Sequence, residues 1–171
     1  AGFPDGANNQ RYTAIPTYDF DYQGLLKWST LTDTHTSKQY VQPTYTITFN
    51  VWTVKTDDGN ATINLWKYVS GNPEGLDYTY NCHGYTFGNS QYWINDQVDA
   101  ILSGDGYILI TGNDKTGARV AYWGNSVHSA KDIVVDAAGT VTSVTGKRGA
   151  QGLKTSAPAD QGFEGVIEYY E

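Results

Sequence analysis

The stretch Tyr80–Leu102, YNCHGYTFGNSQYWINDQVDAIL, contains Cys82, the only cysteine among the 171 residues of the chain. Asn81 is a residue type that often caps helix N-termini, so the sequence predicts a short helix that begins at Cys82. Free N–H groups and the helix dipole in a first helical turn favour the thiolate form of a cysteine. The neighbouring residues are polar or small rather than aliphatic. We therefore interpret Cys82 as a nucleophile, and a thiol that only fills core space is the structural alternative.

A second short helix is expected within the same stretch. Residues 88–90 (GNS) interrupt the first helix, and Asn95 or Asp96 is a suitable cap for a helix over 97–103. The glycine at position 104 can end this second helix. Its buried face would carry Val98, Ile101 and Leu102.

The N-terminal part of the chain is expected to be rich in strands. Residues 43–56 alternate in hydropathy, and together with 61–69 they predict a β-hairpin that closes at the turn 57–60. Residues 1–17 lack periodicity and predict an extended arm, whereas 18–32 fit a short helix. One side of the first hairpin strand would carry Tyr45, Ile47, Phe49, Val51 and Thr53.

Strands are also predicted after the two helices. Residues 146–162 have the glycine and proline content of a loop. A four-residue turn at 136–139 is expected to join two of the strands into a second hairpin. The predicted strands cover 107–111, 118–123, 127–135, 140–145 and 163–171.

Composition supports one mixed domain. Aromatic residues make up 14% of the chain, with fourteen tyrosines, nineteen glycines and no methionine, which favours strands and turns over a helical bundle. A chain of 171 residues is long enough for one core. We expect a single α+β domain over 1–171, with an N-terminal β-rich part at 1–75 and a second part at 76–171 that carries the chemistry.

The charge balance excludes some partners. The formal net charge is −7, and the chain has no cluster of lysine and arginine, so nucleic acid and anionic membranes are not expected partners. No apolar run approaches the roughly 18 residues of a membrane span. The richness in Tyr, Thr, Gly and Asn is typical of proteins that are secreted or located at the cell envelope. The oligomeric state cannot be read from the sequence.

His128, near the start of a predicted strand, is the expected general base for Cys82. If the turn at 136–139 pairs its flanking residues directly, then His128, Ala130, Thr145 and Lys147 lie on one side of the ribbon. A cysteine–histidine pair needs an acceptor for the second ring nitrogen, and a lysine ammonium cannot accept. Thr145 is therefore the predicted orienting residue, and a purely structural role for His128 is the alternative.

The other two histidines are weaker candidates. His83 follows the cysteine directly, and neighbouring helical residues point about 100° apart, so a packing or capping role is more natural for it than proton transfer. His35 lies in a polar segment and is expected on the surface. No CxxC, HxxxH or dense ligand cluster is present, so neither a metal nor another cofactor is expected.

The segments NCHGYTFG, YWINDQVDAILSGDGY, VAYW and VHSAKDIVV resemble an uncharacterised bacterial branch of the NlpC-type and CHAP-type cysteine peptidases and amidases, which belong to the papain-like superfamily. This resemblance covers about residues 80–150. It implies an α+β fold in which a nucleophile helix packs on an antiparallel sheet, with an additional N-terminal β-hairpin in this chain. It implies Cys82 as nucleophile, His128 as base and a polar third residue on the next strand. No Glu, Asn, Asp or His occurs at 140–147, so the third residue departs from the pattern.

The implied chemistry is acyl transfer from a peptide amide, with cell-wall peptide as the substrate class that the resemblance favours. The backbone N–H of Cys82 would help to bind the oxyanion. Tyr80, Asn81 and His83 are candidate oxyanion or substrate-binding residues because they adjoin the nucleophile. The same pair would also serve a transglutaminase or a protein deamidase. A non-catalytic module that binds carbohydrate or protein through its aromatic residues is the alternative from another class.

Overall fold

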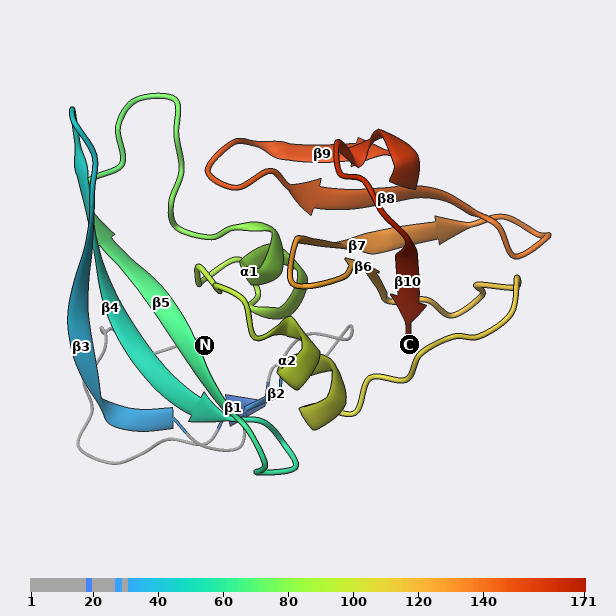
Figure 1. The fold of residues 1–171 in the computed structure, drawn as a ribbon, viewed down its shortest axis with the longest axis horizontal. Helices are drawn as coiled ribbons and strands as arrows, with labels where there is room; N and C mark the ends of the chain where they lie inside the picture. Colours follow the sequence, from blue (N-terminus) through green and yellow to red (C-terminus); the bar gives the residue numbers. More distant parts are fainter. Residues whose placement is uncertain (1–17, 20–26, 29–30) are drawn as a thin grey trace.

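The computed structural model describes residues 18–19, 27–28 and 31–171 of the chain. Two larger antiparallel sheets lie on either side of two short helices, as Figure 1 shows. A separate pair of two-residue strands completes the strand pairing. The α+β class expected from the sequence is therefore confirmed. A helical bundle is excluded.

The N-terminal hairpin is confirmed within a three-stranded sheet of order β3–β4–β5. It consists of β4 (Thr46–Lys55) and β5 (Thr62–Ser70), and β3 (Leu31–Val41) pairs with the other edge of β4. His35 therefore lies on a strand, where it is exposed, rather than in a loop.

The expected single apolar face of β4 is only partly correct. Ile47 and Phe49 are buried on one face, but further along the strand Trp52 and Val54 are buried on the opposite face. The reason is that the two ends of the hairpin contact different neighbours. Trp52 and Val54 belong to the core that also contains helix residues, whereas Phe49 packs edge-on against Trp66.

The short helix expected over 18–32 is wrong for the described residues of that range. Tyr18–Asp19 (β1) and Lys27–Trp28 (β2) are antiparallel strands, and β3 already begins at Leu31. The extended arm expected over 1–17 lies outside the described residues.

The two helices occur where the sequence predicts them. Helix α1 is Cys82–Phe87, and helix α2 is Val98–Gly104. Asn81 caps α1 as expected, but α2 starts after Gln97, whose backbone is left-handed and whose side chain makes no capping hydrogen bond. Gly84 lets α1 approach the following loop, because a Cβ there would lie 1.6 Å from the carbonyl oxygen of Tyr92.

The C-terminal part forms a five-stranded antiparallel sheet of order β10–β6–β7–β8–β9. The expected strand at 107–111 is reduced to a single bridge between Leu109 and Tyr170. The expected loop at 146–162 is wrong in part, since it contains β9 and the 3-10 helix η2. The elements are β6 (Val120–Trp123), β7 (His128–Val135), β8 (Val141–Lys147), β9 (Leu153–Ser156), η2 (Pro158–Gln161) and β10 (Ile167–Tyr170).

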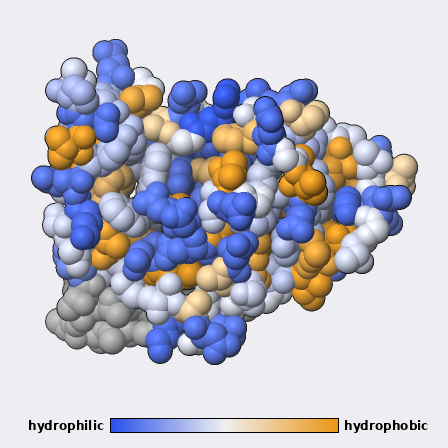
Figure 2. Space-filling model, in the orientation of Figure 1, coloured by the Kyte–Doolittle hydropathy of each residue, from blue (hydrophilic) through white to orange (hydrophobic). Residues whose placement is uncertain are grey.

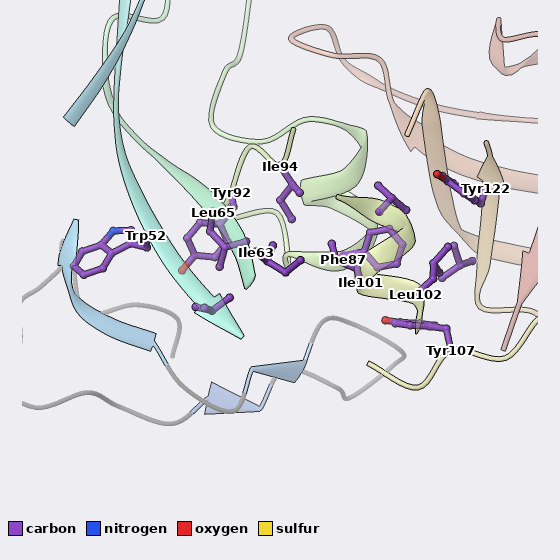
Figure 3. Packing of buried hydrophobic residues seen from close by; sticks show 13 residues of the cluster. Trp52, Ile63, Leu65, Phe87, Tyr92, Ile94, Ile101, Leu102, Tyr107 and Tyr122 are labelled. Carbon is purple, nitrogen blue, oxygen red and sulfur yellow. The ribbon is translucent and has the colours of Figure 1, made fainter. Parts of the chain in front are cut away.

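One hydrophobic cluster joins the two sheets through the helices, as Figure 3 shows from β4 and β5 across to β6. It draws members from both the predicted N-terminal part and the predicted C-terminal part of the chain. A smaller cluster covers the opposite face of the five-stranded sheet and includes Trp123, Ala130 and Val144. The labelled members of the larger cluster are Trp52, Ile63, Leu65, Phe87, Tyr92, Ile94, Ile101, Leu102, Tyr107 and Tyr122.

The surface in Figure 2 is mixed, with hydrophilic residues over its centre and separate hydrophobic patches beside them. Within the described ranges, no helix combines the length and apolar character that crossing a membrane requires.

Candidate functional site

Cys82 lies at the first position of α1, at the bottom of a cleft of about 280 Å³. The Asn81 side chain accepts the N–H of Gly84 at 2.9 Å and donates to the carbonyl of Ile94 at 2.8 Å. These bonds fix the start of the helix against the next loop, so the cysteine has one defined position. The cleft, which we call the Cys82 cleft, is also lined by Asn81, His83, Trp93, Ser126 and Phe163.

The thiol of Cys82 is not a resting thiolate. Cys82 is only 7% exposed, and this burial raises the pKa of its thiol to about 11. Hydrogen bonds from the backbone N–H groups of Ser129, of His83 and of Cys82 itself act in the opposite direction, as does the charge of Lys147. Desolvation outweighs them. The expectation of a lowered pKa for the thiol at the helix start is therefore corrected, because the loss of water on burial outweighs the hydrogen bonds and the charge that favour the thiolate.

His83 is fully occupied by structural hydrogen bonds. Its Nε2 lies 2.8 Å from the carbonyl oxygen of Ser126, and its Nδ1 lies 2.7 Å from Oγ of Ser129. A carbonyl can only accept, so Nε2 carries the proton and Nδ1 accepts from the serine hydroxyl. Burial lowers the pKa of His83 to about 4, which keeps the ring neutral. The packing role expected for His83 agrees with this geometry, although its ring also lines the Cys82 cleft.

His128 is the first residue of β7 and is completely buried. Its ring stacks on Phe163 with centroids 4.1 Å apart and meets Trp123 edge-on at 4.8 Å. Nε2 lies 2.9 Å from Oε1 of Gln161, and Nδ1 has no hydrogen-bond partner among the described residues. Burial lowers the pKa of His128, and the bond to Gln161 only partly opposes this shift.

The Gln161 amide determines which nitrogen of His128 carries the proton. Nε2 of Gln161 donates to the carbonyl of Lys154 and to Oγ of Ser156, each at 2.9 Å. This leaves Oε1 to face His128, and an oxygen of this kind can only accept, so the imidazole proton is on Nε2. Nδ1 consequently carries the free lone pair that a general base needs.

Thr145 does not orient His128. The predicted pairing of Ala130 with Thr145 is wrong, because the structure pairs Lys131 with Thr145. The turn is one residue longer than predicted, because Val135 pairs with Val141 rather than with Thr140. A register shift of one residue moves side chains to the other face of the ribbon. Thr145 instead exchanges a 2.7 Å hydrogen bond with Thr155.

The register separates the side chains of neighbouring β7 residues. Ser129 pairs with Tyr122 and reaches His83 of α1, whereas His128 pairs with Trp123 on the opposite face of the sheet. The Cys82 cleft and the His128 ring meet at Phe163, which lines the cleft and covers one face of the imidazole. The structure thus brings Cys82, Asn81 and His83 into one cleft, and His128 contacts Phe163 of the same cleft.

Tyr80 supports the start of α1 from outside the Cys82 cleft. Its carbonyl accepts a 2.5 Å hydrogen bond from Nζ of Lys147, and the same ammonium lies 4.7 Å from the centre of the Tyr80 ring. Lys147 also donates to the carbonyls of Asp77 and Gly149. Tyr80 is not among the residues that line the Cys82 cleft, and its contacts hold the approach to the helix.

Gln161 is the residue of this site that the sequence analysis missed. A side-chain amide is a suitable partner for the distal nitrogen of a histidine, and only two glutamines follow His128 in the sequence, Gln151 and Gln161. The resemblance places the third residue on the strand after β7, whereas Gln161 lies in η2. The described residues contain no group of three His, Cys, Asp or Glu side chains that could hold a metal ion.

No protein-family model, curated protein sequence or solved structure matches this chain. Its function must be inferred from its own side chains and their geometry.

Proposed function

We propose that this protein is a cysteine-dependent amidohydrolase or peptidase in which Cys82 is the nucleophile and His128 the general base. The observation that carries the proposal is the hydrogen-bonding state of His128. Gln161 fixes its Nε2 proton, and the buried Nδ1 lone pair has no partner within the described part of the chain. A buried polar atom without a partner is costly, and an available lone pair on an oriented imidazole is what a general base requires.

The resting pair would be neutral. Burial keeps the thiol of Cys82 protonated and the imidazole of His128 unprotonated, as the opposite shifts of their pKa values indicate. We therefore favour a mechanism in which the proton moves from Cys82 to His128 during attack, rather than one that starts from a resting thiolate–imidazolium pair. Nδ1 and the sulfur must come within hydrogen-bond reach for this transfer. Phe163 links the two groups, since it lines the Cys82 cleft and stacks on the His128 ring.

The reaction would proceed in two steps, acylation of Cys82 and hydrolysis of the resulting thioester. The sulfur of Cys82 bonds to the amide carbonyl carbon while its proton moves to Nδ1 of His128, and the backbone N–H of Cys82 helps to bind the oxyanion. The carbon–nitrogen bond then breaks, and the proton passes from Nδ1 to the leaving amine. Water attacks the resulting thioester with His128 again as base, which releases the acid and returns the proton to the sulfur.

The papain-like assignment is part of this proposal. A nucleophile at the start of α1, packed on an antiparallel sheet that carries a histidine, is similar to the NlpC-type and CHAP-type arrangement. An amide rather than a residue of the next strand would orient the base, through Gln161 of η2. By this resemblance the substrate is a peptide amide, with cell-wall peptide as the first class to examine, and the protein acts outside the cell or at its envelope.

The test is turnover and acylation by the full-length chain. Wild-type protein, Cys82→Ser and His128→Gln are incubated with bacterial cell-wall peptides and N-acetyl dipeptide amides, and products are identified by mass spectrometry. We expect acid products and a thioester adduct on Cys82 in the wild type only. Amine transfer to added glycine methyl ester would identify a transglutaminase, and conversion of glutamine side chains to glutamate a deamidase. Failure of the wild type to acylate or turn over any amide contradicts the proposal.

A further inference from the structure

A second cavity, of about 460 Å³, opens between the three-stranded sheet and the segment that leads to α1. Its lining includes two amide side chains, Gln39 and Asn95, and the small side chain of Ala150. No charged side chain lines it among the residues that the structure describes. We call this cavity the aromatic groove, and its aromatic lining consists of Tyr40, Phe49, Trp66, Tyr78 and Trp93.

The aromatic groove adjoins the Cys82 cleft. Trp93 and Asn95 line both cavities. The backbone of Trp93 is held in place by two hydrogen bonds with Trp66, of 2.9 and 3.0 Å, which extend β5 by one bridge. A chain bound across Trp93 could therefore place one residue in the groove and its neighbouring amide near the sulfur of Cys82.

The rings form the walls of a pocket rather than a flat platform. Phe49 and Trp66 meet at 77°, Tyr40 and Tyr78 at 42°, and Tyr78 and Trp93 at 26°. Walls at different angles can contact one inserted group from several sides, whereas stacking on a sugar needs an exposed ring face.

The charges around the aromatic groove restrict the class of group that it can bind. Aromatic pockets also bind cationic groups, but this one lacks a carboxylate among its described lining residues. The ammonium of Lys147 lies 5.9 Å from the centre of the Trp93 ring and would repel a second cation there. The same ammonium is already bound by three backbone carbonyls, so it offers little to an anion. Since cationic and anionic groups are both disfavoured, the groove is best suited to a neutral apolar group.

We propose that the aromatic groove is a specificity subsite that binds a neutral aromatic or branched aliphatic side chain of a peptide substrate. The proposal rests on the proposed function for the identity of the substrate as a peptide amide. Burial of one such side chain can change affinity by tenfold or more relative to alanine.

Binding is tested separately from catalysis with full-length Cys82→Ser protein. Tryptophan fluorescence is followed during titration with N-acetyl-X-glycinamide, where X is Phe, Leu, Ala, Lys or Asp. We expect Phe and Leu to bind at least tenfold more tightly than Ala, and Lys and Asp no better than Ala. Tyr40→Ala should weaken Phe binding about threefold to tenfold without harming the fold, because Tyr40 is 45% exposed. Val166→Ala, at a position 82% exposed and outside the groove, is the control and should bind as the parent does.

Equal binding of Phe and Ala, or an unchanged affinity in Tyr40→Ala, would overturn the subsite. Binding of N,N′-diacetylchitobiose in place of the peptides would overturn it as well, in favour of a carbohydrate site. The two proposals fail separately. If the protein binds Phe and Leu peptides selectively but the wild type shows no turnover, the subsite proposal stands and the hydrolase proposal fails. If the wild type turns over amides without preferring Phe or Leu, only the subsite proposal fails.

Discussion

The two buried histidines, His83 on the α1 side of β7 and His128 on the other side, differ in what their ring nitrogens contact. Both nitrogens of His83 are within 2.8 Å of a protein oxygen, whereas His128 has one bound nitrogen and one without a partner in the described chain. His83 is the nearer neighbour of Cys82 in sequence. The free lone pair on His128, rather than closeness to Cys82 along the chain, is the reason that we propose His128 as the base.

The two histidines also differ in how much their side chains contribute to the stability of the fold. His83 joins α1 to β7 through Ser129 and to the preceding turn through Ser126, so its neutral ring is a structural element. His128 contributes only one hydrogen bond and two aromatic contacts. We expect its replacement to affect turnover more than folding, and the reverse for His83.

The largest expected effect is on turnover. His128→Gln removes the base and should lower kcat/KM for a hydrolysed amide by about 10²–10⁴-fold, the usual contribution of general base catalysis. His83→Gln, in protein that circular dichroism shows to be folded, should lower it less than about tenfold. Steady-state kinetics at one pH measures both. Equal losses in the two variants would remove the distinction between the histidines.

The second effect is a pH dependence of stability that belongs to His83. In the folded chain the pKa of His83 is lowered to about 4, whereas in the unfolded chain it has its ordinary value of 6.5. At a pH between these values the unfolded chain therefore binds a proton that the folded chain does not. The free energy of unfolding is therefore fully retained above about pH 6.5 and falls as the pH is lowered toward 4, by roughly 3 kcal/mol from this group. Urea unfolding at several pH values should show a smaller fall in His83→Gln. Parallel profiles for the two proteins would contradict the assignment.

Orientation of His128 by Gln161 predicts a smaller change in activity. Gln161→Leu removes one neutral hydrogen bond to Nε2, worth about 1 kcal/mol, and should reduce kcat/KM about fivefold. Thr145→Val is the matched control, since Thr145 bonds to Thr155 and not to the ring. If Thr145→Val had the larger effect, the orienting residue predicted from sequence would be restored.

The smallest expected effect concerns Phe163. Phe163→Ala should open the His128 ring to the Cys82 cleft and raise the rate of iodoacetamide labelling of Cys82 a few-fold. Val127→Ala is the control, because Val127 lines the same cleft but makes no ring contact with His128. In the wild type, labelling should be slower at pH 7 than that of a free thiol and should keep increasing toward pH 11, since burial raises the pKa of Cys82. Fast labelling near pH 6 would contradict this.

Local patterns in the sequence were sufficient for several elements. Asn81 and the apolar spacing of Val98, Ile101 and Leu102 predicted both helices, because capping and helical periodicity are properties of short segments. The alternation over 43–56 and the turn after it predicted the β4–β5 hairpin for the same reason. Alternation alone could not show that the two ends of β4 bury opposite faces, which depends on what each end contacts.

The third member of the candidate site could not be derived from pairing rules. The turn between β7 and β8 spans residues 136–140 rather than 136–139, because Val135 pairs with Val141, and this extra residue moves the register by one. Gln161 reaches His128 through η2, a short element in a segment whose glycines and prolines predict only a loop. The raised pKa of Cys82 was equally hidden, since burial is a property of the assembled fold.

Gly146 has a consequence for the ancestry of this chain. A Cβ at that position would lie 2.8 Å from Nε2 of His128 and 2.7 Å from Oε1 of Gln161, so any larger residue would collide with the bond between them. A distant relative that keeps this imidazole–amide pair should also keep the glycine. The histidine, the glycine and the glutamine should therefore be retained or lost together.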